Sequence, residues 1–210
     1  MTQRKHYQKV AYFLLLFLIG TGLQAQERTQ NILFFGDSIT AGYGLSEEQA
    51  YPARIGEKLN EHGYNYRITN AGLSGETTAG GVRRVDWILR QDVEIFVLAL
   101  GGNDGLRGID PELTKENLQG IIDKVRNHNA DIQIILAGIE APPNMGSAYT
   151  DRFRNMYPEL AEENGIPLFP FILEGVAGDP ELNLPDGIHP TAEGHEIIAD
   201  HFWDFLQPLL

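Results

Sequence analysis

Three residues of the sequence are of the types needed for nucleophilic acyl transfer: Ser38, Asp186 and His189. A serine hydroxyl becomes a strong nucleophile when an imidazole accepts its proton and a carboxylate orients that imidazole. Asp186 and His189 flank Gly187 on one short segment, so a tight loop can bring the carboxylate to the ring. Pro190 biases His189 away from the helical region. The spacing therefore predicts that Asp186 orients His189, and that His189 accepts the proton of a nucleophile.

The candidate nucleophile, Ser38, follows a short apolar segment that ends at Gly36, where the chain must turn. A serine at this point has its hydroxyl held at the edge of a sheet, which suits a nucleophile. It can equally cap the helix that follows, and this motif alone does not separate the two interpretations. The G-x-S-x-G elbow is not matched, because Thr40 stands two residues after Ser38.

The pair Asp186 and His189 has two other interpretations. Together with His195 it would supply the three protein ligands that zinc needs, but His195 is expected inside the following helix, more than a turn away. A solvated Asp–His pair on the surface is also common, but it does not account for the position of this pair before the last helix. Glycine-rich segments lack the motifs that bind nucleotides. We therefore expect neither a metal nor a cofactor.

Acyl transfer also needs hydrogen-bond donors aimed at the developing oxyanion. The backbone N–H groups of Ser38 and Gly75 and the side-chain amide of Asn103 are the candidate donors. The alternative is that Gly75 and its neighbouring glycines only form tight turns, which leaves Asn103 unexplained.

These residues must be positioned by regular elements, and the hydrophobic pattern predicts five strands that alternate with helices. Short apolar segments predict strands at 31–35, 64–69, 94–100, 132–137 and 167–169. Amphipathic periodicity predicts helices at 52–59, 77–91, 110–125, 150–163 and 191–209. Such alternation is typical of parallel βαβ units. We expect an α/β fold, a three-layer α/β/α sandwich with a five-stranded parallel sheet, whose strand ends gather the candidate residues at one edge.

Composition excludes several classes of protein. The chain has 210 residues, no cysteine and a formal net charge of −13. Without cysteine there is no disulfide, thiol catalysis or thiolate metal site. The excess of acidic residues argues against nucleic acid or an anionic membrane as a partner. The length and apolar content favour one domain with a substantial core.

The N-terminal segment has the pattern of a secretory signal peptide. Arg4, Lys5 and Lys9 precede a nearly continuous apolar stretch, 10–20, and Ala25 offers a small residue for cleavage. We predict a signal peptide at 1–25, a single domain at 26–210, export to the periplasm or the medium, and no stable membrane insertion after cleavage. An uncleaved N-terminal anchor is the alternative, because Leu23 is imperfect for a cleavage site.

Four segments, in this order and spacing, resemble the conserved blocks of the SGNH/GDSL hydrolase family: 36–40, Gly75, 101–104 and 186–190. The segments 100–108 and 141–149 further resemble the thioesterase I / lysophospholipase L1 / arylesterase subgroup. The resemblance implies a flavodoxin-like fold and a metal-free serine esterase. It implies Ser38 as nucleophile, His189 as general acid/base, Asp186 as its orienting partner, and Ser38, Gly75 and Asn103 as oxyanion donors.

The same resemblance implies an acyl pocket between two loops. Its candidate substrate-binding residues are Asp104, Gly105 and Leu106 on one loop and Pro142, Pro143 and Tyr149 on the other. We expect a monomeric, exported esterase that hydrolyses small-molecule acyl esters or thioesters. A carbohydrate O-acetylesterase of the same superfamily is the nearer alternative. A non-catalytic binding module is the more distant one, since all the candidate site residues are present. Trp87 and Trp203 are expected to pack in the core or at an interface.

Overall fold

The chain forms a five-stranded, entirely parallel sheet, described by a computed structural model for residues 28–210. The predicted signal peptide at 1–25 lies outside the described residues. The strand order is β2-β1-β3-β4-β5. The strands are β1 (Gln30–Gly36), β2 (Tyr66–Gly72), β3 (Ile95–Ala99), β4 (Gln133–Ala137) and β5 (Leu168–Phe169). The predicted five-stranded α/β fold is confirmed.

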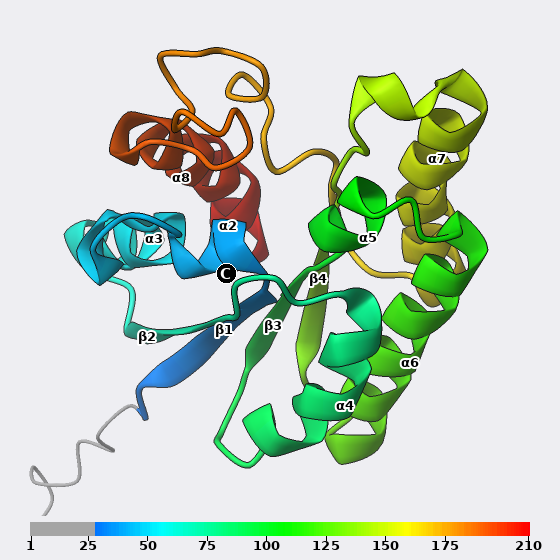
Figure 1. The fold of residues 1–210 in the computed structure, drawn as a ribbon. Coiled ribbons are helices and arrows are strands. Elements are labelled where there is room, and N and C mark those ends of the chain that lie inside the picture. The colour runs from blue at the N-terminus through cyan, green and yellow to red at the C-terminus, as the bar shows by residue number, and fades with distance from the viewer. Residues whose placement is uncertain (1–27) are drawn as a thin grey trace, which may run out of the picture.

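Helices cover both faces of this sheet (Figure 1), with α3 and α8 on one side and α4, α6 and α7 on the other. The longer helices are α3 (Tyr51–Glu61), α4 (Thr78–Ile88), α6 (Pro111–His128), α7 (Ser147–Asn164) and α8 (Ala192–Leu206). Two short helices, α2 (Ser38–Ala41) and α5 (Gly102–Leu106), follow β1 and β3 directly. Single turns of 3₁₀-helix occur at η1 (Glu47–Gln49), η2 (Pro143–Met145) and η3 (Gln207–Leu209).

The central strands are buried on both faces, which explains why their sequences are continuous apolar runs rather than alternating ones. Adjacent residues of β1 point to opposite layers. Phe34 packs against Tyr51 of α3 and Phe202 of α8. Phe35 packs against Phe96 and lies under the guanidinium of Arg84 from α4. One strand therefore joins the two helical layers into a common core.

Three details differ from the sequence-based expectation or extend it. Strand β2 begins at Tyr66 rather than at Tyr64, whose ring packs edge-on against Trp203. Trp203 is buried as expected, whereas Trp87 is 64% exposed near the end of α4, which excludes the core for Trp87 and leaves packing at an interface as a prediction. Across residues 28–210, none of the helices has the length and apolar character required to cross a bilayer.

Candidate active site

Ser38 lies at the C-terminal edge of the sheet, as the first residue of α2. The preceding residue, Asp37, caps this helix, and its carboxylate accepts the N–H of Ile39 at 3.1 Å. The two interpretations of Ser38 are thereby separated, because the cap is Asp37 and the serine hydroxyl makes another contact. Oγ of Ser38 lies 2.9 Å from Nε2 of His189.

The imidazole of His189 links the serine to a carboxylate. Its Nδ1 lies 2.7 Å from Oδ2 of Asp186, and this contact places the N–H on Nδ1. Nε2 is then free to accept the hydroxyl proton of Ser38. The structure thus brings together, in one continuous hydrogen-bonded chain, the three residues that the sequence singled out.

The loop that carries Asp186 and His189 is tightly organised. The second carboxylate oxygen of Asp186 accepts the backbone N–H groups of Ile188 at 2.9 Å and His189 at 3.0 Å. The N–H of Leu184 in turn donates to the carbonyl oxygen of His189 at 2.7 Å. Hydrogen bonds from the His189 ring and then from these backbone groups lower the pKa of Asp186 to about 2, so the carboxylate is ionised across the physiological range.

Asn103 follows β3 on the short helix α5, next to the end of β1. The turn into α5 requires glycine at position 101. There φ is +130°, and a Cβ would lie 2.1 Å from the hydroxyl of Tyr157, which donates to the carbonyl of Leu100. Asn103, on this short helix, borders the same cleft as Ser38.

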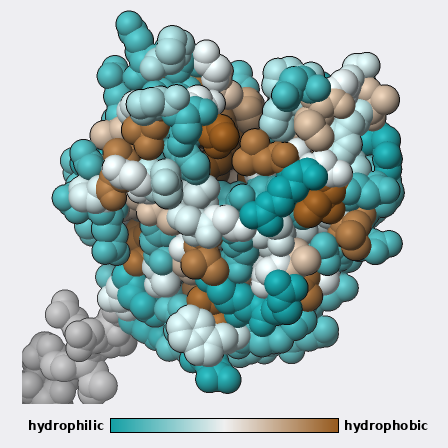
Figure 2. All heavy atoms as spheres, viewed as in Figure 1, coloured by the Kyte–Doolittle hydropathy of each residue, from teal (hydrophilic) through white to brown (hydrophobic). Residues whose placement is uncertain are grey.

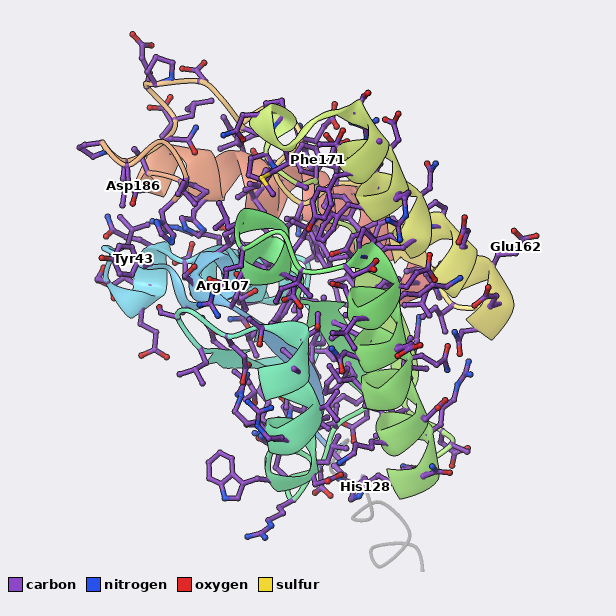
Figure 3. The ribbon with its side chains drawn as sticks, turned by 45° about the vertical axis from the view of Figure 1, so that its right-hand side comes forward. Tyr43, Arg107, His128, Glu162, Phe171 and Asp186 are labelled. Atoms are coloured by element: carbon purple, nitrogen blue, oxygen red, sulfur yellow. The ribbon has the colours of Figure 1, made fainter. Side chains whose placement is uncertain are left out.

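The loop that carries Gly75 is joined to the same region. The guanidinium of Arg107, just after α5, donates to the carbonyl oxygen of Gly75 at 3.1 Å. The loop after β2 and the loop after β3 are therefore connected. Figure 3 shows Phe171 and Asp186 in the upper part of the molecule, Tyr43 and Arg107 at about mid-height, and His128 at the bottom.

A buried carboxyl group that the sequence analysis did not assign lies beneath the site. Asp37 is 1% exposed, and its Oδ2 lies 3.5 Å from Nδ2 of Asn103. Burial raises the pKa of Asp37 to about 6, although the hydrogen bond from Ile39 opposes the shift. Its position next to Ser38 in the chain was the available signal, but sequence alone does not show whether an aspartate is buried.

A cleft of about 660 Å³ opens beside Ser38 and Asn103. Figure 2 shows apolar side chains gathered in the hollow between the parts of the molecule formed by α8 and α7. The apolar residues that line the cleft are Ile39, Leu106, Ile139, Ala141, Pro142, Pro143, Met145, Phe171, Leu173, Ala177 and Ile188. Such a surface suits a hydrocarbon chain better than a polar ligand.

The expected substrate-binding residues divide into two groups. Leu106, Pro142 and Pro143 line the cleft, whereas Asp104, Gly105 and Tyr149 are not among the residues that line it. Gly105 packs against Ala141 and Phe153, with no room for ligand between them. These three residues support the wall rather than form its surface.

Asp104 and Tyr149 support the wall through hydrogen bonds. Asp104 is fully buried, and its carboxylate accepts the N–H of Thr78 at 2.9 Å and the hydroxyl of Thr78 at 2.6 Å. This contact fixes α5 to the start of α4. The hydroxyl of Tyr149 donates to the carbonyl oxygen of Ile109 at 2.7 Å, which holds the end of the 104–110 loop.

His195, the third ligand of the alternative zinc site, has a different partner. Its Nδ1 accepts the backbone N–H of Tyr51 at 3.1 Å, and the ring is buried in α8. Desolvation lowers the pKa of His195 to about 4, so the ring is neutral. Within the part of the chain that the structure describes, no group of three or more His, Asp or Glu side chains is arranged to hold a metal ion.

Known proteins resemble this chain over most of its length. The GDSL-like Lipase/Acylhydrolase family model matches residues 34–197. Esterase TesA of Pseudomonas aeruginosa is 39% identical over 189 residues, which cover 90% of this chain and 93% of that protein. Thioesterase 1/protease 1/lysophospholipase L1 of Escherichia coli is 38% identical over 196 residues, which cover 93% of this chain and 91% of that protein.

Solved structures agree with these sequence matches. A crystal structure of TesA, 38% identical to this chain, superposes with a TM-score of 0.82 and covers 86% of this chain and 100% of that one. Because the sequence identity is this high over nearly the whole of both chains, we assign to this protein the activity of the family as well as its fold. The protein therefore belongs to the GDSL-like Lipase/Acylhydrolase (GDSL/SGNH hydrolase) family and is a carboxylic ester hydrolase.

Proposed function

We propose that this protein is an exported serine esterase that hydrolyses ester or thioester bonds of acyl substrates through an acyl-enzyme on Ser38. The observation that carries the proposal is the unbroken chain of hydrogen bonds from Ser38 through His189 to Asp186, beside an apolar cleft. A hydroxyl paired with an oriented imidazole is the arrangement that activates serine.

In the acylation step, Oγ of Ser38 attacks the carbonyl carbon while its proton moves to Nε2 of His189. The negative charge of Asp186 stabilises the imidazolium that results. The carbonyl oxygen becomes an oxyanion, and the N–H groups of Ser38 and Gly75 and the amide of Asn103 donate to it. When the tetrahedral intermediate collapses, the bond to the leaving group breaks, and His189 returns the proton to the departing alcohol or thiol.

Deacylation repeats these events with water in place of Ser38. His189 accepts a proton from water as the hydroxide equivalent adds to the acyl carbon, and the proton then passes to Oγ of Ser38 as the carboxylic acid leaves. The products are one acid and one alcohol or thiol, and the side chains return to their starting protonation.

The size and lining of the cleft favour acyl chains longer than acetyl. Its volume of about 660 Å³ exceeds what an acetyl group fills, and its surface is largely apolar. One relative is named an esterase, and another carries the names thioesterase and lysophospholipase, which is consistent with acyl substrates of several kinds.

Hydrolysis of p-nitrophenyl esters from acetyl to palmitoyl, by the purified protein and its Ser38→Ala variant, tests the proposal. We expect turnover that extends to medium or long chains and is abolished in Ser38→Ala. Activity confined to the acetyl ester would favour a carbohydrate O-acetylesterase, to be tested with acetylated sugars. No activity on any ester, or full activity in Ser38→Ala, would contradict the proposed mechanism.

Export and a monomeric state form part of the proposal. The basic residues Arg4, Lys5 and Lys9, followed by the apolar stretch 10–20, support export. N-terminal sequencing of the protein recovered outside the cytoplasm is expected to begin at Gln26. An intact N-terminus on the membrane fraction would instead indicate an anchor. Light scattering is expected to give the mass of one chain.

A further inference from the structure

The ring of Tyr43 lies against the ring of His189, and the mechanism described above does not use it. The two ring centroids are 4.4 Å apart, and the ring planes are inclined at 35°. Tyr43 is 50% exposed, so the contact is not a consequence of burial in the core. In Figure 3, Tyr43 lies near Asp186, from which the catalytic loop continues to His189.

A tight turn connects Tyr43 to Ser38, the candidate nucleophile. Gly42 caps the C-terminal end of α2. Its φ is +72°, and a Cβ there would lie 2.7 Å from the Cβ of Ala50, so glycine is required. The reversal at Gly42 lets the N–H of Tyr43 donate to the carbonyl oxygen of Ser38 at 3.0 Å. The same turn therefore fixes the backbone of Tyr43, whose ring contacts His189, to the backbone of Ser38.

Both nitrogens of His189 already have partners, because Nδ1 faces Asp186 and Nε2 faces Ser38. Tyr43 contacts the imidazole across the ring rather than at a nitrogen, and so does not compete with either bond. An aromatic face attracts a cation within about 6 Å of its centroid and attracts a neutral ring less. The contact therefore strengthens when His189 accepts the proton of Ser38, and an interaction that strengthens in this way accelerates the reaction.

We propose that Tyr43 is a positioning residue that stabilises the protonated form of His189 through a cation–π contact. This inference rests on the proposed function, in which His189 accepts the proton of Ser38. Asp186, Asp37 and the neutral His195 also interact electrostatically with His189. All three are unchanged when only Tyr43 is replaced.

The test compares aromatic and aliphatic side chains at position 43. Tyr43→Phe keeps the ring and removes the hydroxyl, whereas Tyr43→Leu and Tyr43→Met keep apolar bulk and remove the ring. We expect kcat of Tyr43→Phe within about twofold of the parent, and a loss of roughly two- to fivefold in both aliphatic variants, with KM unchanged. The loss should be the same for acetyl and longer esters, because protonation of His189 is common to all of them.

Trp87→Leu is the matched control, since Trp87 is an exposed aromatic residue at the far end of α4. Its kcat should equal that of the parent. Equal kcat in Tyr43→Phe and Tyr43→Leu would overturn the proposal, and so would a change confined to KM, which would make Tyr43 a wall for the leaving group. Ser38→Ala, assayed in the same series, tests the proposed function separately, because its retained activity would contradict that function whatever Tyr43 does.

Discussion

Asp37 and Asn103 face one another across the ends of β1 and β3, with Oδ2 of the carboxyl group 3.5 Å from Nδ2 of the amide. The carboxyl group is fully buried, while the amide borders the cleft. A titratable group thus lies directly behind a candidate oxyanion donor. Its protonation state affects both the stability of the fold and the surroundings of Asn103.

Asp37→Asn is expected to change how stability depends on pH. The carboxyl titrates at 3.8 in its ordinary state and at about 6 in the native protein, because burial disfavours the charge. Between these values the native state holds a proton that the unfolded chain has released, so the free energy of unfolding falls as pH rises from about 4 to 6. Asparagine does not titrate. The stability of Asp37→Asn relative to the parent should therefore rise across this window, by on the order of 2–3 kcal/mol.

Urea denaturation of both proteins at pH 4 and pH 7 measures this difference. Asp186 contributes equally to both proteins, so its own titration cancels when the variant is compared with the parent. Parallel stability profiles for parent and variant would show that Asp37 is ionised in the native state at acid pH.

Asn103→Ala is expected to lower kcat by roughly 10²–10³-fold, with little change in KM, because an oxyanion donor acts mainly in the transition state. The only hydrogen bond of its amide that the structure shows is the 3.5 Å contact with Asp37, so the variant should unfold at nearly the parent temperature. Steady-state kinetics with one p-nitrophenyl ester, combined with thermal denaturation, measures both quantities. An unchanged kcat would remove Asn103 from the oxyanion site.

Asp186→Asn is expected to lower kcat by about 10²–10⁴-fold, because an amide no longer fixes the tautomer of His189 or stabilises its cation. The His189 hydrogen bond holds the pKa of Asp186 at about 2, so the parent enzyme should show no titration of this carboxylate above about pH 4. Asp179→Asn, an exposed aspartate on the same long loop, is the control. The role of Asp186 fails if both variants retain parent activity from pH 5 to 9.

Ala177→Trp is expected to shorten the preferred acyl chain. Ala177 lines the cleft from the loop that follows β5, together with Phe171 and Leu173, and it is exposed, so a larger side chain fits without disturbing the core. We expect kcat/KM for octanoyl and longer esters to fall by roughly tenfold, while the acetyl ester is unaffected. A uniform loss at all chain lengths would show that the acyl chain binds elsewhere.

The strands and long helices were predictable because buried parallel strands are continuous apolar runs and the helices carry apolar stripes. The short helices α2 and α5 were not predicted, since four or five residues show no helical period. Strand β2 continues through Asn70 to Gly72, which pair with Phe34 to Gly36 of β1. That continuation depends on the neighbouring strand and is invisible in the composition of the segment itself.

The sequence was enough to predict that Ser38, Asp186 and His189 lie close together, because parallel strands end at one edge of a sheet. The role of Asp104 could not be predicted. The sequence shows a polar residue beside Asn103, but it does not show that this residue is buried and hydrogen-bonded to Thr78. Tyr43 was missed for a similar reason. A single aromatic residue in a loop gives no periodic signal, and its contact with His189 arises only from the tertiary fold.

Asp186 accepts hydrogen bonds from both the ring and the backbone N–H of His189. The carboxylate and the imidazole are therefore held on the same short loop. A displacement of this loop carries the two groups together, and the bond that it breaks is the one between His189 and Ser38. A molecule with this loop displaced would keep the Asp186–His189 pair and lose only its contact with Ser38. Substitutions that loosen this loop should reduce the fraction of molecules whose Ser38 reacts with an active-site label. Each molecule that does react should turn over at the parent rate.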